Sequence, residues 1–370
     1  MNTNSLFKYL FLPCSVLIVL CAYMWIAYEN SDSRYFHLTK KPVISYPSHS
    51  GYHQLLADAF LHGQLNLRVE PQSELLALPD PYDPKLNVRY KLTEATLFNG
   101  KYYLYFTPAV ALLFELPFKV LFGYYISESL LLGFLGGLGF VFSVLSLRQI
   151  CANANAIPSQ PMQVCSIFVL ATGSAVPLLL SNPLVYSLCI AQSYAFLMMA
   201  LFFLIRASEQ KSTHNKGILL FAGFLLGLCF ISRPNQLFAC ALLVLAFFRI
   251  YYVNSHVTLR VLVGQCILLI SPLLLIGLIM SGYNYARYHS LFEFGLTYQL
   301  NHLNMPQFHF ASYNFIFSGI QAYLFQPFAI RLSWPFFYFA NAVLVNSSAE
   351  YNYSPEIGLF FFPVFWLGLH

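Results

Sequence analysis

Apolar stretches of bilayer-spanning length recur along almost the whole chain. A transmembrane helix needs roughly 20 consecutive apolar residues, and runs of about this length lie at residues 6–28, 126–147, 163–182, 184–205, 217–232, 236–253 and 261–282, with a last one starting near Ile357. Only 9% of the 370 residues are charged, whereas a soluble domain has about 25%. The sequence therefore predicts an all-α polytopic membrane protein with about eight transmembrane helices. It has no basic run that would indicate a nucleic-acid partner.

Two long polar segments interrupt the apolar pattern. They cover residues 29–125 and 283–355, and every other connection between apolar runs is short. We therefore expect one transmembrane domain over 1–370. The sequence stops at His370 within an apolar run, which is the pattern expected of a chain truncated at its C-terminus.

Basic residues predict the orientation, because Lys and Arg concentrate in cytoplasmic loops. One set of short loops carries Arg148, Arg206, Lys211, Lys216, Arg249 and Arg260. The opposite short turns carry only Arg233. This distribution places the N-terminus in the cytoplasm and both polar segments outside, with thirteen of the fourteen acidic residues. The expected location is the plasma membrane, which is the inner membrane in a bacterium.

That orientation depends on whether residues 97–123, LFNGKYYLYFTPAVALLFELPFKVLFG, cross the membrane. Asn99-Gly100 predicts a hairpin turn, and the apolar run that follows contains Glu115 and Lys119. Each charge at the bilayer centre costs about 2.5–3.5 kcal/mol on insertion scales. We therefore expect an interfacial helix on the outer face rather than a transmembrane one.

A second helix is predicted in GYHQLLADAFLHGQLNL, where apolar residues recur at helical spacing and Gly63 ends the helix. His53, Asp58 and His62 fall off the apolar face. Such residues are typical of the solvated face of a surface helix. Alternatively, the helix holds the Asp58 carboxylate near the bilayer surface, where it takes part in catalysis.

The segment ALPDPYDPKL contains two Asp-Pro pairs. Asp before Pro is typical of turns. Alternatively, a rigid loop presents Asp80 and Asp83 to a cation or a sugar hydroxyl.

Candidate binding residues lie in three other outer segments. Lys101 can meet a phosphate as a point charge, and an Arg such as Arg233 suits bidentate phosphate recognition. Tyr102, Tyr103 and Tyr105 suit a sugar site, or else an aromatic belt at the membrane interface. Arg287, in SGYNYARYHSLFEFG, suits a polar site or a head-group interface.

Several classes of protein are disfavoured by what the sequence lacks. It contains no Walker motif, GxGxxG, HExxH or nucleophile elbow. Its eight cysteines lie in or beside apolar runs, so they indicate core positions rather than a metal site or a disulfide framework.

Four segments together resemble the GT-C superfamily of integral-membrane glycosyltransferases, which includes protein O-mannosyltransferases and lipid A aminoarabinose transferases. YHQLLADAFLHGQL is similar to the family's first interfacial helix, and GKYYLYFTPAVALLFELPFKVLFG is similar to its Lys-Pro-Pro-containing helix. ISRPN and YNYARYHSLFEFG also resemble segments of bacterial members. The resemblance covers most of the chain and implies a GT-C-like bundle with interfacial helices in the first extracytoplasmic loop.

The resemblance implies an inverting sugar transfer from a polyprenyl-phosphate-linked donor, with a carboxylate of the first outer loop as general base. Some members use a divalent cation. The usual acid before the first interfacial helix is absent here, so Asp58, or else Asp80 or Asp83, is the expected base. Phe106-Thr107-Pro108 stands where relatives have Lys-Pro-Pro, so Lys101 or Arg233 is expected to bind the phosphate.

The sequence thus predicts a cell-envelope glycosyltransferase acting on a lipid, glycan or protein acceptor. The expected site comprises Asp58, Asp80 and Asp83 as catalytic acids, with Arg233 and Lys101 at the phosphate, and Tyr102, Tyr103, Tyr105, His53 and Arg287 around the sugar. Two alternatives remain open at this stage. They are a carrier or flippase for lipid-linked sugars, and a catalytically inactive relative that acts as an assembly partner.

Overall fold

The computed structural model describes residues 3–30, 38–42, 51–105, 107–181, 183–209, 216–255 and 258–307, and two short strands further on. Contacts divide the chain into two units. The first contains Met1–Ala171 and Val176–Pro306, and the second contains Thr172–Ala175 and Gln307–His370. In the second unit, the described strands β3 (Phe328–Ile330) and β4 (Phe337–Phe339) form an antiparallel pair.

The first unit is built around long apolar helices. Their bounds are α1 Thr3–Glu29, α6 Glu128–Asn153, α7 Gln160–Thr172, α8 Val176–Ser181, α9 Val185–Glu209, α10 Lys216–Ser232, α11 Leu237–Ser255 and α12 Leu259–Tyr288. Four described helices, α1, α6, α9 and α12, are long and apolar enough to cross a membrane, whereas α7, α10 and α11 are shorter apolar helices. The predicted mostly helical membrane protein is therefore confirmed in this coarse form.

The apolar run at 163–182 differs from the single helix that we expected. The structure divides it into α7 and α8, with bends at residues 173–175. Gly173 directly follows α7, and Pro177 is the second residue of α8. A glycine just past a helix end and a proline in a first turn are the usual residues at such a break. The last apolar run, from Ile357, lies outside the described residues.

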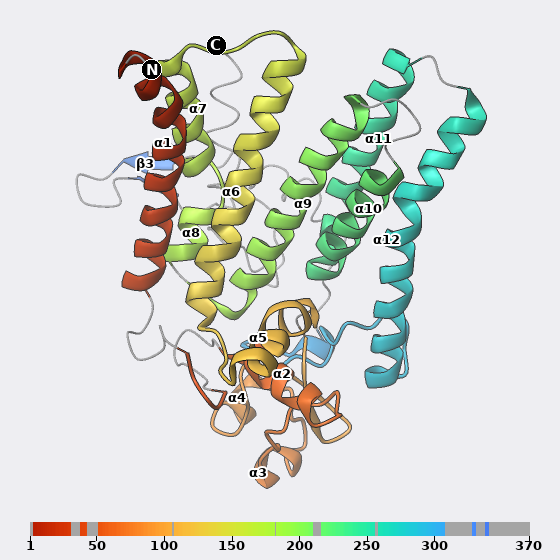
Figure 1. Cartoon of the computed structure of the whole chain (residues 1–370). Coiled ribbons are helices and arrows are strands. Elements are labelled where there is room, and N and C mark those ends of the chain that lie inside the picture. Colours follow the sequence, from red (N-terminus) through yellow and green to blue (C-terminus); the bar gives the residue numbers. More distant parts are fainter. Residues whose placement is uncertain are drawn as a thin grey trace. The chain divides into compact units, whose positions relative to one another are not determined.

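The long helices pack through small residues on facing sides. Helix α6 lies against α9, and α10 lies between α9 and α12 (Figure 1). At Gly139 of α6, an added Cβ would come within 2.4 Å of the Tyr194 ring on α9. At Gly223 of α10, it would come within 2.0 Å of the Leu269 carbonyl oxygen on α12. Glycine at these positions permits the close backbone approach that is common between membrane helices.

The segment between α1 and α6 forms short elements at one end of these helices (Figure 1). They are α2 Tyr52–Leu61, α3 Ser73–Leu76, α4 Pro84–Asn87, β1 Ala95–Phe98, β2 Lys101–Leu104, the π-helical turn η1 Ala111–Glu115 and α5 Leu116–Phe122. α1 ends and α6 begins at this end of the bundle (Figure 1).

The Asn99-Gly100 prediction is confirmed. β1 and β2 pair in antiparallel register with Phe98 opposite Lys101, and Asn99 and Gly100 have φ values of 48° and 69°. Two residues with positive φ form the type I′ turn that matches strand twist. The helix after the hairpin is short, because η1 and α5 together cover only Ala111–Phe122. At about 1.5 Å per residue it is too short to cross a bilayer, and its interfacial position stays a prediction.

The chain beyond α12 attaches to the edge of this hairpin. The Glu94 amide donates to the Leu300 carbonyl, the Leu97 amide donates to the Tyr298 carbonyl, and the Leu300 amide donates to the Ala95 carbonyl. The first polar segment and the start of the second therefore lie together at the same end of the long helices. A 3₁₀ turn, η3 (Met305–Gln307), follows.

Candidate functional site

A cavity of about 470 Å³ opens where the chain just after β2, the helices α9, α10 and α12, and the chain after α12 meet. Its lining residues are Tyr105, Thr107, Tyr186, Cys189, Ile231, Ser232, Arg233, Pro234, Asn235, Met280, Phe292, Glu293, Phe294, Leu296 and Thr297. All of them belong to the first unit. The lining combines one Arg, one carboxylate and several aromatic rings with apolar side chains from the helices. A small polar set within an apolar wall is the usual composition of a ligand site.

Arg233 reaches the cavity because proline interrupts the helix. Pro234 starts the 3₁₀ turn η2 (Pro234–Gln236), and Arg233 before it is extended, with φ −150° and ψ 111°. A residue before proline is driven to such a conformation by steric contact with the proline ring. The side chain is half-buried and makes no hydrogen bond or ion pair with any described residue. Its guanidinium donors are therefore available to a ligand.

Glu293 is the only acid among the residues that line this cavity. Its Oε1 accepts a hydrogen bond from the Gly295 amide, and its Oε2 accepts one from the Thr297 hydroxyl at 2.8 Å. Gly295 has φ +98°, and an added Cβ there would lie 2.4 Å from the Tyr288 hydroxyl oxygen. A glycine is needed for this turn, and the turn fixes the orientation of the carboxylate.

Tyr105 is the one tyrosine of the predicted sugar site that lines the cavity. Burial raises the pKa of its hydroxyl, and the nearby Arg233 partly offsets that shift. The hydroxyl thus stays protonated at neutral pH and can donate a hydrogen bond. Thr107 is also in the lining, and its Oγ1 accepts from the Ala109 amide at 3.1 Å. Phe106 lies outside the described residues.

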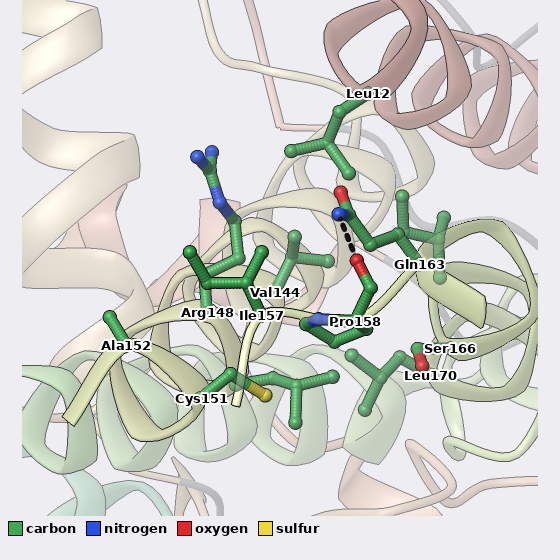
Figure 2. A pocket seen from close by; sticks show the side chains of 12 residues that line it. Leu12, Val144, Arg148, Cys151, Ala152, Ile157, Pro158, Gln163, Ser166 and Leu170 are labelled. Atoms are coloured by element: carbon green, nitrogen blue, oxygen red, sulfur yellow. Dashed lines mark hydrogen bonds between the residues drawn. The ribbon is translucent and has the colours of Figure 1, made fainter. Parts of the chain in front are cut away.

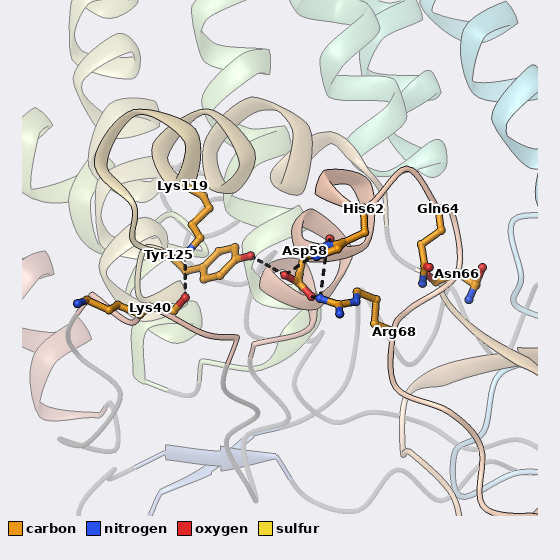
Figure 3. A network of polar contacts seen from close by, with 8 residues as sticks. All are labelled: Lys40, Asp58, His62, Gln64, Asn66, Arg68, Lys119 and Tyr125. Carbon is orange, nitrogen blue, oxygen red and sulfur yellow. Dashed lines mark hydrogen bonds and ion pairs between the residues drawn. The ribbon is translucent and has the colours of Figure 1, made fainter.

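Asp58 lies in a separate polar network (Figure 3). Its Oδ2 is 2.9 Å from Arg68 Nη1, its Oδ1 accepts from the Tyr125 hydroxyl at 3.1 Å, and His62 Nδ1 is 3.8 Å from Oδ1. On the other side of the Tyr125 ring lies Lys119, whose Nζ is 4.5 Å from the ring centroid. Asp58 is not among the cavity's lining residues. In the structure, Asp58 therefore connects α2 to Arg68 and to Tyr125.

Asp80 and Asp83 shape their own loop. Asp80 Oδ1 accepts from the Tyr82 amide at 2.9 Å, and its Oδ2 accepts from Asn304 Nδ2 at 2.8 Å. Asp83 caps α4 by accepting from the Lys85 amide at 2.9 Å. Each carboxylate thus accepts from the backbone amide two residues further on, which is the geometry that the turn interpretation predicts. Neither carboxylate lines the cavity with Arg233.

The remaining hairpin residues face other neighbours. Lys101 is exposed at the turn, and Tyr102 is buried, with its hydroxyl accepting from the Leu92 amide at 3.2 Å. The Tyr103 ring packs edge-on against Tyr288, with centroids 5.5 Å apart. None of the three is in the cavity lining.

His53 and Arg287 are both buried close to the site. His53 is fully buried, in contrast to the expected polar face, and its Nε2 is 3.3 Å from the Val185 carbonyl and 3.9 Å from Sγ of Cys189, a lining residue. Burial lowers the pKa of His53 from 6.5 to about 4, so its imidazole is neutral at pH 7.

Arg287 joins α12 to the hairpin. It donates to the Leu104 carbonyl and to Asn284 Oδ1, both at 2.8 Å, and its guanidinium carbon is 3.9 Å from the Tyr283 ring centroid. Its guanidinium is therefore occupied by the protein, whereas that of Arg233 has no hydrogen-bond or ion-pair partner among the described residues.

The sequence analysis did not identify a pair of buried acidic residues, Glu115 and Glu128. Glu115 has no exposed surface and Glu128 is 7% exposed. Glu115 Oε2 accepts from the Ile126 amide at 3.1 Å, and Glu128 Oε1 accepts from the His53 amide at 3.1 Å. Burial, reinforced by the Glu128 carboxylate, raises the pKa of Glu115 well above its ordinary value. The sequence showed both acids beside apolar runs but gave no sign of their proximity.

No group of three His, Cys, Asp or Glu side chains with metal-binding geometry occurs among the described residues. All eight cysteines are free. No protein-family model, curated protein or solved structure is significantly similar to this chain.

Proposed function

We propose that this chain is an inverting membrane glycosyltransferase that takes sugar from a polyprenyl-phosphate-linked donor and acts on the extracytoplasmic face. Within this proposal the fold is a GT-C-like bundle of about eight transmembrane helices with a cytoplasmic N-terminus. The observation that supports it most is that Arg233 and Glu293 line the same cavity at one end of the long apolar helices. The general base proposed here is Glu293, whereas the sequence analysis expected Asp58, or else Asp80 or Asp83.

Arg233 supplies the phosphate-binding group in this proposal. Its guanidinium has no acidic partner among the described residues, and charge-assisted Arg–phosphate hydrogen bonds are among the strongest that proteins form. Ile231, Met280 and Phe292 add apolar wall to the same cavity. An apolar wall next to a guanidinium fits a ligand in which a phosphate joins a hydrocarbon chain.

Glu293 acts as general base. The acceptor hydroxyl attacks the anomeric carbon, its proton passes to the Glu293 carboxylate, and the bond between that carbon and the phosphate oxygen breaks. Polyprenyl phosphate leaves with both bonding electrons, and Arg233 stabilises the added negative charge. A single displacement of this kind inverts the anomeric configuration. Tyr105 and Phe294, both in the lining, offer ring faces to the sugar.

The test is sugar transfer by the full chain in proteoliposomes, with a panel of labelled polyprenyl-phosphate sugars and lipid, glycan and peptide acceptors. Positioned general bases contribute about 10²–10⁴-fold to a rate, so Glu293→Gln should lower kcat by that factor while donor binding persists. Arg233→Gln should weaken donor binding. Glu74→Gln and Arg89→Gln, exposed residues outside the cavity, are the matched controls and should retain wild-type transfer.

The alternatives give different results in the same vesicles. Movement of labelled donor across the membrane without any acceptor would favour a carrier. Donor binding at Arg233 with neither transfer nor movement would favour an inactive assembly partner. Transfer by Glu293→Gln at the wild-type rate would exclude Glu293 as the base.

A further inference from the structure

Two adjoining hollows lie away from the Arg233 cavity, one between α6 and α7 and the other between α1 and α6. The first, of about 180 Å³, is lined by Leu12, Val144, Leu147, Arg148, Cys151, Ala152, Ile157, Pro158, Gln163, Ser166, Ile167 and Leu170 (Figure 2). The second, of about 420 Å³, is lined by Leu12, Pro13, Val16, Leu17, Leu20, Val141, Val144, Leu145 and Arg148. They share Leu12, Val144 and Arg148, so together they form one groove, here called the α1–α6 groove.

The dimensions of the α1–α6 groove match part of a lipid chain. On α1 its lining extends from Leu12 to Leu20, which at about 1.5 Å per residue is about 12 Å. Half of a bilayer's hydrocarbon core is about 15 Å thick. The second hollow is lined by aliphatic side chains and a proline apart from Arg148. An acyl chain of one leaflet therefore has both the length and the polarity that this groove accepts.

Arg148 lies at the depth of a lipid head group. It follows Glu128, the first residue of α6, by 20 residues, which corresponds to about 30 Å along the helix, the thickness of the hydrocarbon core. The Arg148 side chain is exposed and has no acidic partner among the described residues. Figure 2 shows it extending past Ile157, with its guanidinium clear of the other lining side chains.

We propose that the α1–α6 groove binds an anionic phospholipid, with one acyl chain along α1 and α6 and the phosphate on Arg148. Basic pockets between transmembrane helices bind anionic head groups in this way. A free anion would use Arg148 but would leave the apolar groove empty, whereas a neutral lipid would use the groove but gain little from the guanidinium. The combination of the two features selects an anionic lipid.

The test uses the full chain, purified in detergent and stripped of lipid, with its melting temperature measured against added lipid. Dioleoylphosphatidylglycerol should raise the melting temperature in a saturable way and more than dioleoylphosphatidylcholine does. Arg148→Gln should require about tenfold more dioleoylphosphatidylglycerol and lose the preference between the two lipids. Arg148→Lys, which keeps the positive charge, should keep part of that preference.

A matched control and a groove-filling variant locate the lipid. Arg206, on α9, reaches Gln149 Oε1 with its Nη1 at 3.5 Å and does not line the groove, so Arg206→Gln should respond as the wild type does. Leu17 is 59% exposed, so Leu17→Trp fills the groove without disturbing the core and should weaken the response to both lipids. An unchanged response in Leu17→Trp, or equal losses in Arg206→Gln and Arg148→Gln, would overturn the proposal. So would an equal shift with glycerol phosphate, which has the head-group charge but no chains.

Discussion

The Tyr125 hydroxyl donates a hydrogen bond of 3.1 Å to Asp58 Oδ1, and this contact joins α2 to the chain just before α6. The backbone of Tyr125 is held on its other side, because its amide donates to the Thr39 carbonyl at 2.8 Å. Asp58 therefore connects parts of the first polar segment that are 67 residues apart in sequence. We therefore expect Asp58 to stabilise the end of the molecule where the cavity lies.

Asp58→Asn should lower stability and leave transfer intact in the protein that folds. The exchange removes the ion pair with Arg68 and weakens the hydrogen bond from Tyr125. An exposed ion pair contributes about 0–1 kcal/mol and a typical hydrogen bond about 1 kcal/mol, so the free energy of unfolding should fall by about 1–2 kcal/mol. Chemical unfolding in detergent measures this, with Tyr125→Phe as the variant that removes only the second contact. A well-folded Asp58→Asn protein with no transfer would return the role of base to Asp58.

Glu115 should make the protein less stable as the pH rises. Burial raises the pKa of Glu115 well above its ordinary value, with the Glu128 carboxylate adding to the shift. A raised folded-state pKa means that the stabilising contribution is full below the unfolded pKa of 4.5 and is lost as the pH rises through the folded pKa. Glu115→Gln should flatten this loss in a series of melting temperatures above pH 4.5. The exposed Glu70→Gln should keep the wild-type slope.

His53 should make the protein less stable as the pH falls. Burial lowers its pKa from 6.5 to about 4. The contribution of the neutral imidazole is therefore full above pH 6.5 and is lost as the pH falls through about 4. His53→Gln should melt at a temperature that changes less between these pH values, whereas His302→Gln, at an exposed position, should follow the wild type. If His53→Gln shows the same change in melting temperature between pH 6.5 and pH 4 as the wild type does, the burial of His53 is contradicted.

Local signals in the sequence were sufficient where one short segment determines the structure. Asn99-Gly100 specified its turn because both residues tolerate positive φ, and the Asp-Pro pairs behave as turn residues. Arg233 could be singled out because it is the one basic residue in the short outer turns between apolar runs. The apolar runs predicted a mostly helical membrane protein for the same reason, since each run carries its own pattern.

The long-range contacts of the acids could not be predicted, because no local pattern records them. Asp58 meets Tyr125 across 67 residues of sequence. Glu115 comes near Glu128 where it accepts from the Ile126 amide and where Glu128 accepts from the His53 amide of α2. Glu293 resembled any other acid of an outer loop. Its place in the same cavity as Arg233 depends on how the chain after α12 joins the edge of β1, and no local pattern records that pairing.

The spacing of α10 and α12 yields the last prediction, made with two glycines of these helices. An added Cβ at Gly223 would lie 2.0 Å from the Leu269 carbonyl oxygen, whereas one at Gly264 would meet no atom within 4 Å. Overpacking typically costs about 1–3 kcal/mol, and Ala is favoured over Gly in a helix by up to about 1 kcal/mol. Gly223→Ala should therefore lower the melting temperature, because the backbone carbonyl cannot move aside without separating the two helices. Gly264→Ala should leave the melting temperature unchanged or raise it. Equal melting temperatures for the two variants would contradict the close approach of α10 and α12 at Gly223.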